Sequence, residues 1–303
     1  MGVVLAILAG LVALPFLAEL IRRPVHRKRA PGEFAELLQG DTHYRWSGPE
    51  GGPVAVCIHG LSTPSYVFAA TERSLNTLGY RVLTYDLYGR GFSARARGPQ
   101  TASFFVRQLK ALLRDQGVEG PVLLVGFSMG GSIAAVYAAS EPTRVSRIIL
   151  IASAGLLPPV DDLRRWFWSS RGLGDWTTRV LGGLALRREL VEHRSNGTVI
   201  PNLEDRQAVE TRTRGFLPAI LSSRRNVLRE PREVDHRIIA EQGIPVLGIW
   251  GANDPITPLA ALGRLTELNP DAHHAQIPGG GHYVLQTHPA QVADAMRRFL
   301  KSD

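Results

Sequence analysis

Ser128 lies in a stretch whose composition suits nucleophilic chemistry. The apolar run Val122–Val125 is typical of a strand buried on both faces of a parallel sheet, and a Gly-x-Ser-x-Gly motif follows it directly at residues 126–130. Small residues then continue at a helix-compatible spacing. The pattern predicts a strand, a sharp turn and a helix with Ser128 at the apex, where the two glycines avoid a Cβ clash with neighbouring elements. A glycine-rich turn with a capping serine is the structural alternative.

A serine hydroxyl needs a base within hydrogen-bond reach, and the base needs a group that fixes its tautomer. Asp254 and His282 fit these roles, because each comes just past a predicted strand in a loop rich in Gly or Pro. The order Ser, Asp, His is expected when all three lie at one edge of a doubly wound sheet. Taken separately, Asp254 could start the turn before Pro255, and His282 could be a polar loop residue after three glycines.

Other acids and histidines fit this site less well. Asp86 also follows a predicted strand and is the main rival acid, with bracing of the glycine-rich loop 86–93 as its structural role. His59 follows a strand too, but in a His-Gly pair we expect it to shape the turn. The remaining rivals lie near the last predicted strand, at the start of the last helix or in the inserted segment: His273, His274, His288, His193 and His236.

Acyl transfer develops a negative charge on one oxygen, which two backbone amides usually stabilise. We expect one amide to be that of Met129, at the N-terminus of a predicted helix. The other should come from the loop after His59-Gly60, with Leu61 as the donor. A backbone donor does not depend on the side chain, so leucine is acceptable there.

The elements that must position these residues alternate between strand and helix through residues 42–154 and 244–303. The predicted strands are Thr42–Trp46, Val54–Ile58, Tyr80–Tyr85, the run from Val122, Arg147–Ile151, Ile244–Trp250 and His273–Ile277, and the predicted helices are Tyr66–Leu78, Thr101–Gln116, Pro258–Leu268 and Pro289–Leu300. This alternation predicts an α/β fold with a doubly wound, mostly parallel sheet. Ligands bind at the C-terminal ends of such strands, where the candidate residues lie.

Residues 155–243 interrupt this alternation and indicate an inserted helical cap, with helix-like runs at Leu181–Leu190 and Phe216–Leu228. Three tryptophans in the segment could line a pocket for an apolar acyl group or form the core of the cap. They are Trp166, Trp168 and Trp176. The arginines of the segment could meet phospholipid head groups or cover a solvated face.

Residues 1–23 begin with an uncharged apolar run that can just span a bilayer as a helix. The basic residues follow this run, between positions 22 and 29, which favours an uncleaved anchor with the catalytic domain on the cytoplasmic side. An atypical signal peptide or a surface-lying helix are the alternatives, and Pro15 and Glu19 weaken a spanning helix. Residues 24–41 indicate a basic linker with a short helix at Glu33–Leu38.

The chain of 303 residues has a formal net charge of +8, which suggests an affinity for anionic surfaces. Nucleic acid is not expected as a partner, since no basic run is interleaved with aromatic residues. Cys57 is the only cysteine and excludes an intrachain disulfide; within an apolar strand pattern, it is expected to be a small core residue.

Together these motifs resemble the α/β-hydrolase family over about Thr42–Leu300. The matching residues are His59-Gly60, Asp86-x-x-Gly89-x-Gly91-x-Ser93, Gly126-x-Ser128-x-Gly130-Gly131, Asp254 and Gly281-His282. The resemblance implies a sheet of about eight strands, a lid over the site and no cofactor; we also expect no metal. The apolar N-terminal helix followed by a capped hydrolase resembles membrane-associated monoacylglycerol lipases and esterases.

The expected function is hydrolysis of carboxylic esters with apolar acyl groups, including lipid esters. Family members that open epoxides or displace halide carry an aspartate where this chain has Ser128. Hydrolases of carbon–carbon bonds in ring-cleavage products often have a tryptophan after the histidine, where this chain has Tyr283. Such a hydrolase, a perhydrolase or an acyltransferase on the same triad remains an alternative. A catalytically inactive, membrane-tethered binding module is a further one.

Overall fold

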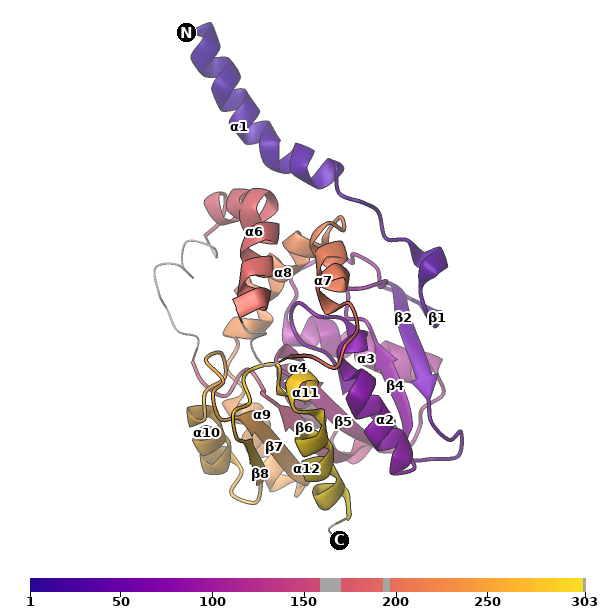
Figure 1. Ribbon diagram of the computed structural model, residues 1–303. Coiled ribbons are helices and arrows are strands. Elements are labelled where there is room, and N and C mark those ends of the chain that lie inside the picture. Colours follow the sequence, from indigo (N-terminus) through magenta and orange to yellow (C-terminus); the bar gives the residue numbers. More distant parts are fainter. Residues whose placement is uncertain (159–169, 193–196, 302–303) are drawn as a thin grey trace.

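A mostly parallel sheet forms the centre of the protein in a computed structural model, which describes residues 1–158, 170–192 and 197–301 (Figure 1). Within these residues the sheet has eight strands in the order β1-β2-β4-β3-β5-β6-β7-β8. Only the pairs β1–β2 and β2–β4 are antiparallel. The strands are β1 Glu33–Leu37, β2 Gly40–Ser47, β3 Val54–Ile58, β4 Arg81–Tyr85, β5 Val122–Phe127, β6 Val145–Ile151, β7 Val246–Gly251 and β8 His273–Ile277. The predicted α/β fold class is confirmed.

Both faces of the sheet carry a hydrophobic core because side chains alternate along each strand. In β3, Val56 and Ile58 join the core on one face, and Ala55 and Cys57 join the core on the other. Cys57 is fully buried and unbridged, as expected, and burial raises the pKa of its thiol well above the ordinary value. Strand β5 is buried along its whole length. Covering both faces explains the uninterrupted apolar runs of these strands.

Helices cover the two faces of the sheet. The helices α3, α4, α9 and α10 contribute to one core, and α2, α11 and α12 to the other. Their bounds are α2 Ala69–Thr77, α3 Ala102–Asp115, α4 Met129–Ser140, α9 Glu233–Glu241, α10 Ala260–Leu268, α11 Val284–Thr287 and α12 Pro289–Lys301. Helix α3 begins one residue after the predicted start at Thr101, whose side chain caps the helix by accepting a hydrogen bond from the Phe104 amide.

The short helix predicted at Glu33–Leu38 is wrong, because this segment is strand β1. Residues 33–37 pair with residues 40–44 of β2 in an antiparallel hairpin, and Gly40 adopts a φ of +130° next to the turn. The Tyr44 hydroxyl also donates to Glu33 Oε2 across the pair. Helix-forming residue types are therefore overridden by pairing with a neighbouring strand, since propensity is a weak preference.

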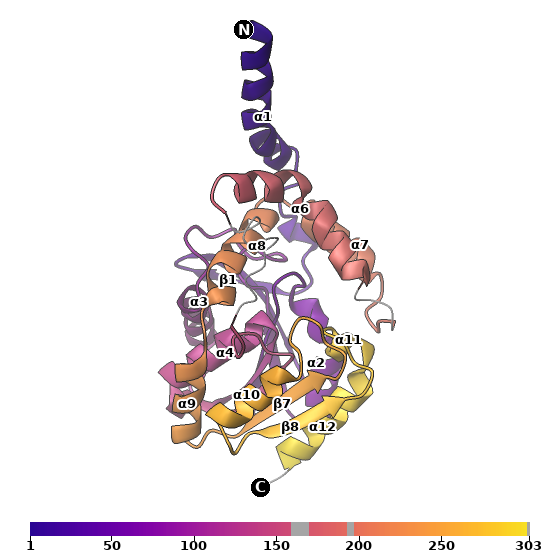
Figure 2. The same cartoon turned by 90° about the vertical axis from the view of Figure 1, so that its left-hand side faces the viewer.

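Three helices of the inserted segment, here called the cap helices, lie between the N-terminal helix and the sheet (Figures 1 and 2). They are α6 Leu173–Glu192, α7 Leu203–Thr211 and α8 Phe216–Arg225. The predicted run Leu181–Leu190 falls within α6, and Phe216–Leu228 spans α8 and most of the 3₁₀ turn Val227–Arg229. Helix α9 packs against the core helix α4 instead. Trp166, Trp168 and His193 lie outside the described residues.

Helix α1, Gly2–Leu20, projects from the cap helices (Figure 2). Most of its apolar side chains are exposed. By length and composition it could cross a bilayer, a test that a signal sequence also passes. Its C-terminal end is joined to the cap helices: the Arg23 amide donates to Arg212 O at 3.0 Å, and the Arg214 amide donates to Arg23 O at 2.9 Å. The indole of Trp176 donates to Leu11 O at 2.7 Å, so this tryptophan faces α1.

Candidate active site

Ser128 occupies a sharp turn between β5 and α4. Its φ of +52° and ψ of −117° are unusual for a residue with a side chain and cost of order 1–3 kcal/mol. A Cβ at Gly126 would lie 2.6 Å from Gly130 O, and a Cβ at Gly130 would lie 1.9 Å from Ile58 O. The Ser128 amide donates to Ile151 O at 2.9 Å, which anchors the turn to the next strand. Close packing thus holds the strained serine at the end of the sheet.

His282 links Ser128 to Asp254. Its Nε2 lies 3.0 Å from Ser128 Oγ, and its Nδ1 lies 2.9 Å from Asp254 Oδ2. Asp254 follows β7 and His282 follows β8; the two loops are held together by the Asn253 amide, which donates to Gly280 O at 2.8 Å. The structure therefore brings together the three residues that the sequence selected, although 154 residues separate Ser128 from His282.

The Asp254 carboxylate is held on both oxygens. Oδ1 accepts from the amides of Ile256 at 2.7 Å and Thr257 at 2.9 Å, and Oδ2 accepts from the Thr257 hydroxyl and from His282. Burial alone raises the pKa of Asp254, but the hydrogen bond and charge of His282 and the Thr257 donors outweigh it, so the pKa lies below the ordinary value. An ionised Asp254 keeps a proton on Nδ1 of His282 and leaves Nε2 free to accept the serine proton.

The two expected oxyanion donors, the amides of Leu61 and Met129, have no protein acceptor among the described residues. The peptide that carries the Leu61 amide is fixed from its other side, because His59 Nδ1 lies 2.8 Å from Gly60 O and donates to it. His59 Nε2 accepts from the Leu87 amide at 2.9 Å, which sets this tautomer. Burial lowers the pKa of His59 to about 4, so the ring is neutral at pH 7. His59 shapes this turn, as the sequence suggested.

Comparison with known proteins decides the family. A family model described as alpha/beta hydrolase fold matches residues 53–289. The chain belongs to the α/β-hydrolase family.

This α/β hydrolase is similar to two curated proteins at low sequence identity. It is 27% identical over 258 residues to the pimeloyl-[acyl-carrier protein] methyl ester esterase of Xanthomonas axonopodis pv. citri, covering 83% of this chain and 96% of the relative. It is 24% identical over 228 residues to the 2-hydroxy-6-oxo-6-(2'-aminophenyl)hexa-2,4-dienoic acid hydrolase of Metapseudomonas resinovorans, covering 73% and 74%. The solved enol-lactonase of Burkholderia xenovorans LB400 superposes with a TM-score of 0.74 at 20% identity, covering 89% and 100%, which supports the fold.

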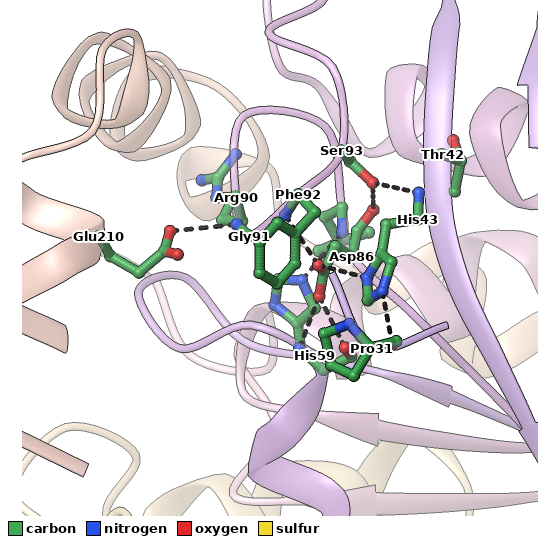
Figure 3. Close-up of polar contacts among 12 residues, drawn as sticks. Pro31, Thr42, His43, His59, Asp86, Arg90, Gly91, Phe92, Ser93 and Glu210 are labelled. Carbon is green, nitrogen blue, oxygen red and sulfur yellow. Dashed lines mark hydrogen bonds and ion pairs between the residues drawn. The ribbon is translucent and has the colours of Figure 1, made fainter. Parts of the chain in front are cut away.

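The rival acid of the α/β hydrolase, Asp86, belongs to a separate buried cluster (Figure 3). Its Oδ2 lies 2.8 Å from His43 Nδ1 and accepts from the Phe92 amide, and its Oδ1 accepts from both the amide and the hydroxyl of Ser65. Burial raises the pKa of Asp86, but its bonds to His43 and Ser65 outweigh this and hold the pKa at about 2. His43 Nε2 is itself 2.9 Å from Pro31 O, so both ring nitrogens are engaged. This pair braces the loops that lead into the site.

The other candidate histidines do not bond to Ser128 in the part of the chain that the structure describes. His273 and His274 lie on the edge strand β8, His288 precedes α12, and His236 is buried on α9. Across residues 1–158, 170–192 and 197–301, no group of three or more His, Cys, Asp or Glu side chains is placed to hold a metal ion.

Sequence reasoning overlooked His43, Arg90 and Glu210, which connect the loops around the site. His43 lies in a predicted strand of alternating residues, and its neighbours give no sign that its ring reaches Asp86. Arg90, in the glycine-rich loop, donates to Ser223 of α8, and Glu210, in α7, accepts from the Gly91 amide of that loop. No local pattern in the sequence identifies these contacts, because each joins segments far apart in the chain.

Proposed function

We propose that the protein is a serine hydrolase that cleaves carboxylic esters of apolar acyl groups through an acyl-enzyme on Ser128. One observation carries the proposal: His282 lies within hydrogen-bond distance of both Ser128 Oγ and Asp254 Oδ2. Nucleophile, base and orienting acid stand in the relation that acyl transfer requires. The relationship to an esterase of known substrate supports the same reaction class.

In this mechanism Ser128 Oγ attacks the ester carbonyl carbon while His282 Nε2 takes the hydroxyl proton. The C–O bond to the alcohol then breaks, and His282 returns the proton to the departing oxygen. Water attacks the acyl-enzyme next, giving its proton to His282, and the acid leaves as the proton returns to Ser128. Asp254 keeps Nδ1 of His282 protonated and stabilises the imidazolium that forms in each step.

The amides of Leu61 and Met129 are proposed to stabilise the oxyanion. The absence of a protein acceptor for either amide among the described residues leaves both available to a ligand. The N-terminus of α4 adds a favourable electrostatic field at Met129. Loss of one such donor costs about 3–4 kcal/mol in comparable sites.

The apolar acyl specificity is supported by a small cluster that the cap helices place against the catalytic loops. Leu186, Phe216, Leu217 and Ile220 pack together with Leu61 and Tyr283. Leu61 carries a proposed oxyanion amide and Tyr283 follows the proposed base, so the cluster borders the reacting groups. We propose that residues 155–243 act as a lid and that this cluster, rather than Trp176, contacts the acyl chain.

A carbon–carbon bond hydrolase is the second candidate, because one relative is named as a hydrolase of a substituted hexa-2,4-dienoic acid, a substrate of the dienone-acid type. The same serine, histidine and aspartate would serve it. Purified protein offered short p-nitrophenyl esters and a dienone diacid separates the two, and adding an alcohol acceptor detects acyl transfer. We expect ester cleavage to exceed cleavage of the dienone acid.

We propose further that residues 1–23 anchor the protein to a membrane, with the hydrolase on the cytoplasmic side. The exposed apolar surface of α1 and the basic residues that follow it support this placement. Deleting residues 2–20 should move the protein from the membrane fraction to the soluble fraction. Equal membrane association of both forms would contradict the anchor.

The function is tested by a screen of acylglycerols and of p-nitrophenyl esters of graded chain length. Ser128→Ala is the control, with an expected loss on the order of 10³ to 10⁶ in turnover. Ser74→Ala, which removes a hydroxyl bonded to Ala70 O within α2, should behave as the unsubstituted protein. Equal rates for the unsubstituted protein and Ser128→Ala would remove the mechanism.

A further inference from the structure

Arg90 is fully buried, and all five of its guanidinium N–H groups find acceptors. Nε donates to Leu61 O at 3.1 Å. Nη1 donates to Tyr88 O at 2.9 Å and to Gln100 Oε1. Nη2 donates to Ser223 Oγ at 2.7 Å and to Ala219 O at 3.5 Å. The side chain therefore has no spare donor, and every acceptor around it is a neutral oxygen.

These acceptors come from separate parts of the protein. Leu61 belongs to the proposed oxyanion loop, and Ala219 and Ser223 belong to the cap helix α8. The Ser223 hydroxyl also donates to Gln100 Oε1 at 2.7 Å, so serine, glutamine and arginine form one connected group. The next residue of the loop extends the link, because the Gly91 amide donates to Glu210 Oε2 of α7 at 3.0 Å (Figure 3).

A buried cation depends on every one of its acceptors. No carboxylate within ion-pair distance of Arg90 is found in the described residues, so its hydrogen bonds all go to neutral oxygens, while the more distant charge of Glu210 favours the cation and that of Arg95 opposes it. Burial lowers the pKa of Arg90 to about 9, which still leaves it charged at pH 7. A buried donor of this kind that loses its partner destabilises the arrangement, because its desolvation is no longer compensated. A cap helix that moves away would therefore force the guanidinium to turn and release the Leu61 carbonyl.

We propose that Arg90 is a positioning residue that couples the seating of helix α8 to the geometry of the Leu61 amide. When α8 is seated, Ser223 and Ala219 hold the guanidinium, and its Nε fixes Leu61 from the carbonyl side while His59 fixes the preceding peptide. When α8 lifts, the oxyanion donor loses one of these two restraints. The enzyme thus reaches its full rate only with the cap closed. This inference rests on the proposed serine-hydrolase function.

The test removes the hydrogen bond between Arg90 and the Ser223 side chain of α8 and leaves the proposed catalytic residues unchanged. Ser223→Ala deletes one hydroxyl on α8, and Ser74→Ala is the matched control on α2, away from the cap helices. Two rates are measured on the full-length protein: hydrolysis of p-nitrophenyl acetate and phosphonylation of Ser128 by a fluorophosphonate, since both need the oxyanion donors. For Ser223→Ala we expect kcat and the phosphonylation rate constant to fall about tenfold, with KM changed by about twofold at most and stoichiometric final labelling.

A second variant, Arg90→Gln, removes the centre of the link. If Arg90 and Ser223 act as one unit, the double variant should be no slower than Arg90→Gln alone. Additive losses, or a Ser223→Ala protein that melts at a lower temperature but keeps the unsubstituted kcat and phosphonylation rate, would overturn the coupling. Failure of the unsubstituted protein to label at Ser128 would instead refute the proposed function, and the coupling with it.

Discussion

Replacing Asp254 by asparagine tests whether this side chain sets the tautomer of His282, because it exchanges one hydrogen-bond acceptor for a donor. Oδ1 of the native carboxylate faces the amides of Ile256 and Thr257, which can only donate. Oδ2 faces the Thr257 hydroxyl and Nδ1 of His282, both of which can change role. The asparagine carbonyl must therefore take the Oδ1 position, and its NH₂ group must point at His282.

An NH₂ group at that position forces His282 to accept on Nδ1 and to carry its proton on Nε2. This is the wrong tautomer for a base, because Nε2 then donates toward Ser128 Oγ and cannot take its proton. A triad with the equivalent substitution loses about 10⁴ in kcat, which corresponds to about 5 kcal/mol in the activation free energy. We expect a loss of this size for Asp254→Asn, with KM little changed.

The assay is steady-state hydrolysis of a p-nitrophenyl ester near pH 7, with thermal melting to confirm that each variant is folded. Asp271→Asn, which removes an exposed carboxylate outside the site, is the matched control. Asp86→Asn distinguishes the rival acid: it should lower the melting temperature through the His43 cluster and retain turnover in the folded protein. Turnover by Asp254→Asn within tenfold of the unsubstituted protein, or a folded but inactive Asp86→Asn, would refute the assignment.

Two further substitutions test the packing and the electrostatics around the site. Gly130→Ala should destabilise the protein by about 2 kcal/mol or more and abolish turnover, because the new Cβ would lie 1.9 Å from Ile58 O. Gly263→Ala in α10 is the control, since its Cβ would have open space around it. Chemical denaturation and ester hydrolysis should show neither effect for this control. Burial raises the pKa of Glu210 from 4.5 to about 7, against the opposing charge of Arg95. The protonated side chain therefore favours the folded state below about pH 4.5, and this contribution of about 3 kcal/mol to the unfolding free energy is lost as the pH rises through about 7. Urea melts should therefore show the unfolding free energy of the unsubstituted protein falling relative to Glu210→Gln over this range, and parallel pH curves would contradict it.

The residues proposed for catalysis could be predicted because each follows directly from a local pattern. Ser128 and Asp254 come directly after the buried apolar strands β5 and β7, and His282 follows the short edge strand β8, all in turns rich in Gly or Pro. Parallel strands end at the same edge of a sheet, so residues far apart in the chain must meet there. Their meeting thus required only the correct assignment of the strands, which the apolar runs indicated for β5 and β7 and the glycine-rich turn after Ile277 indicated for β8.

The first strand was missed because its signal is not local. Residues 33–38 contain good helix formers, and what makes them a strand is the hairpin with β2, closed next to Gly40. An edge strand pairs on one side only and shows a weak alternation, with Ala35 as its one buried residue. Tertiary pairing decided the structure here, and short segments of helix-forming composition are where such errors are expected.

The contacts of the cap helices with the core also escaped prediction, since no sequence pattern relates their partners. Gly91 and Glu210 are 119 residues apart, and Arg90 and Ser223 are 133 apart. A charged loop residue is usually exposed to solvent. Arg90 is fully buried, with helix α8 contributing two of its hydrogen-bond acceptors. The sequence could identify an insertion but not the polar contacts that seat it.

The proposed mechanism makes Ser128 a nucleophile that His282 activates. Incubating the full-length protein with a fluorophosphonate and mapping the modified peptide by mass spectrometry detects such a nucleophile. We predict a single adduct on Ser128, formed in proportion to loss of esterase activity and absent from Ser128→Ala. A protein that remains unmodified, or an adduct on another residue with Ser128 intact, would contradict the account and leave an inactive hydrolase fold as the better description.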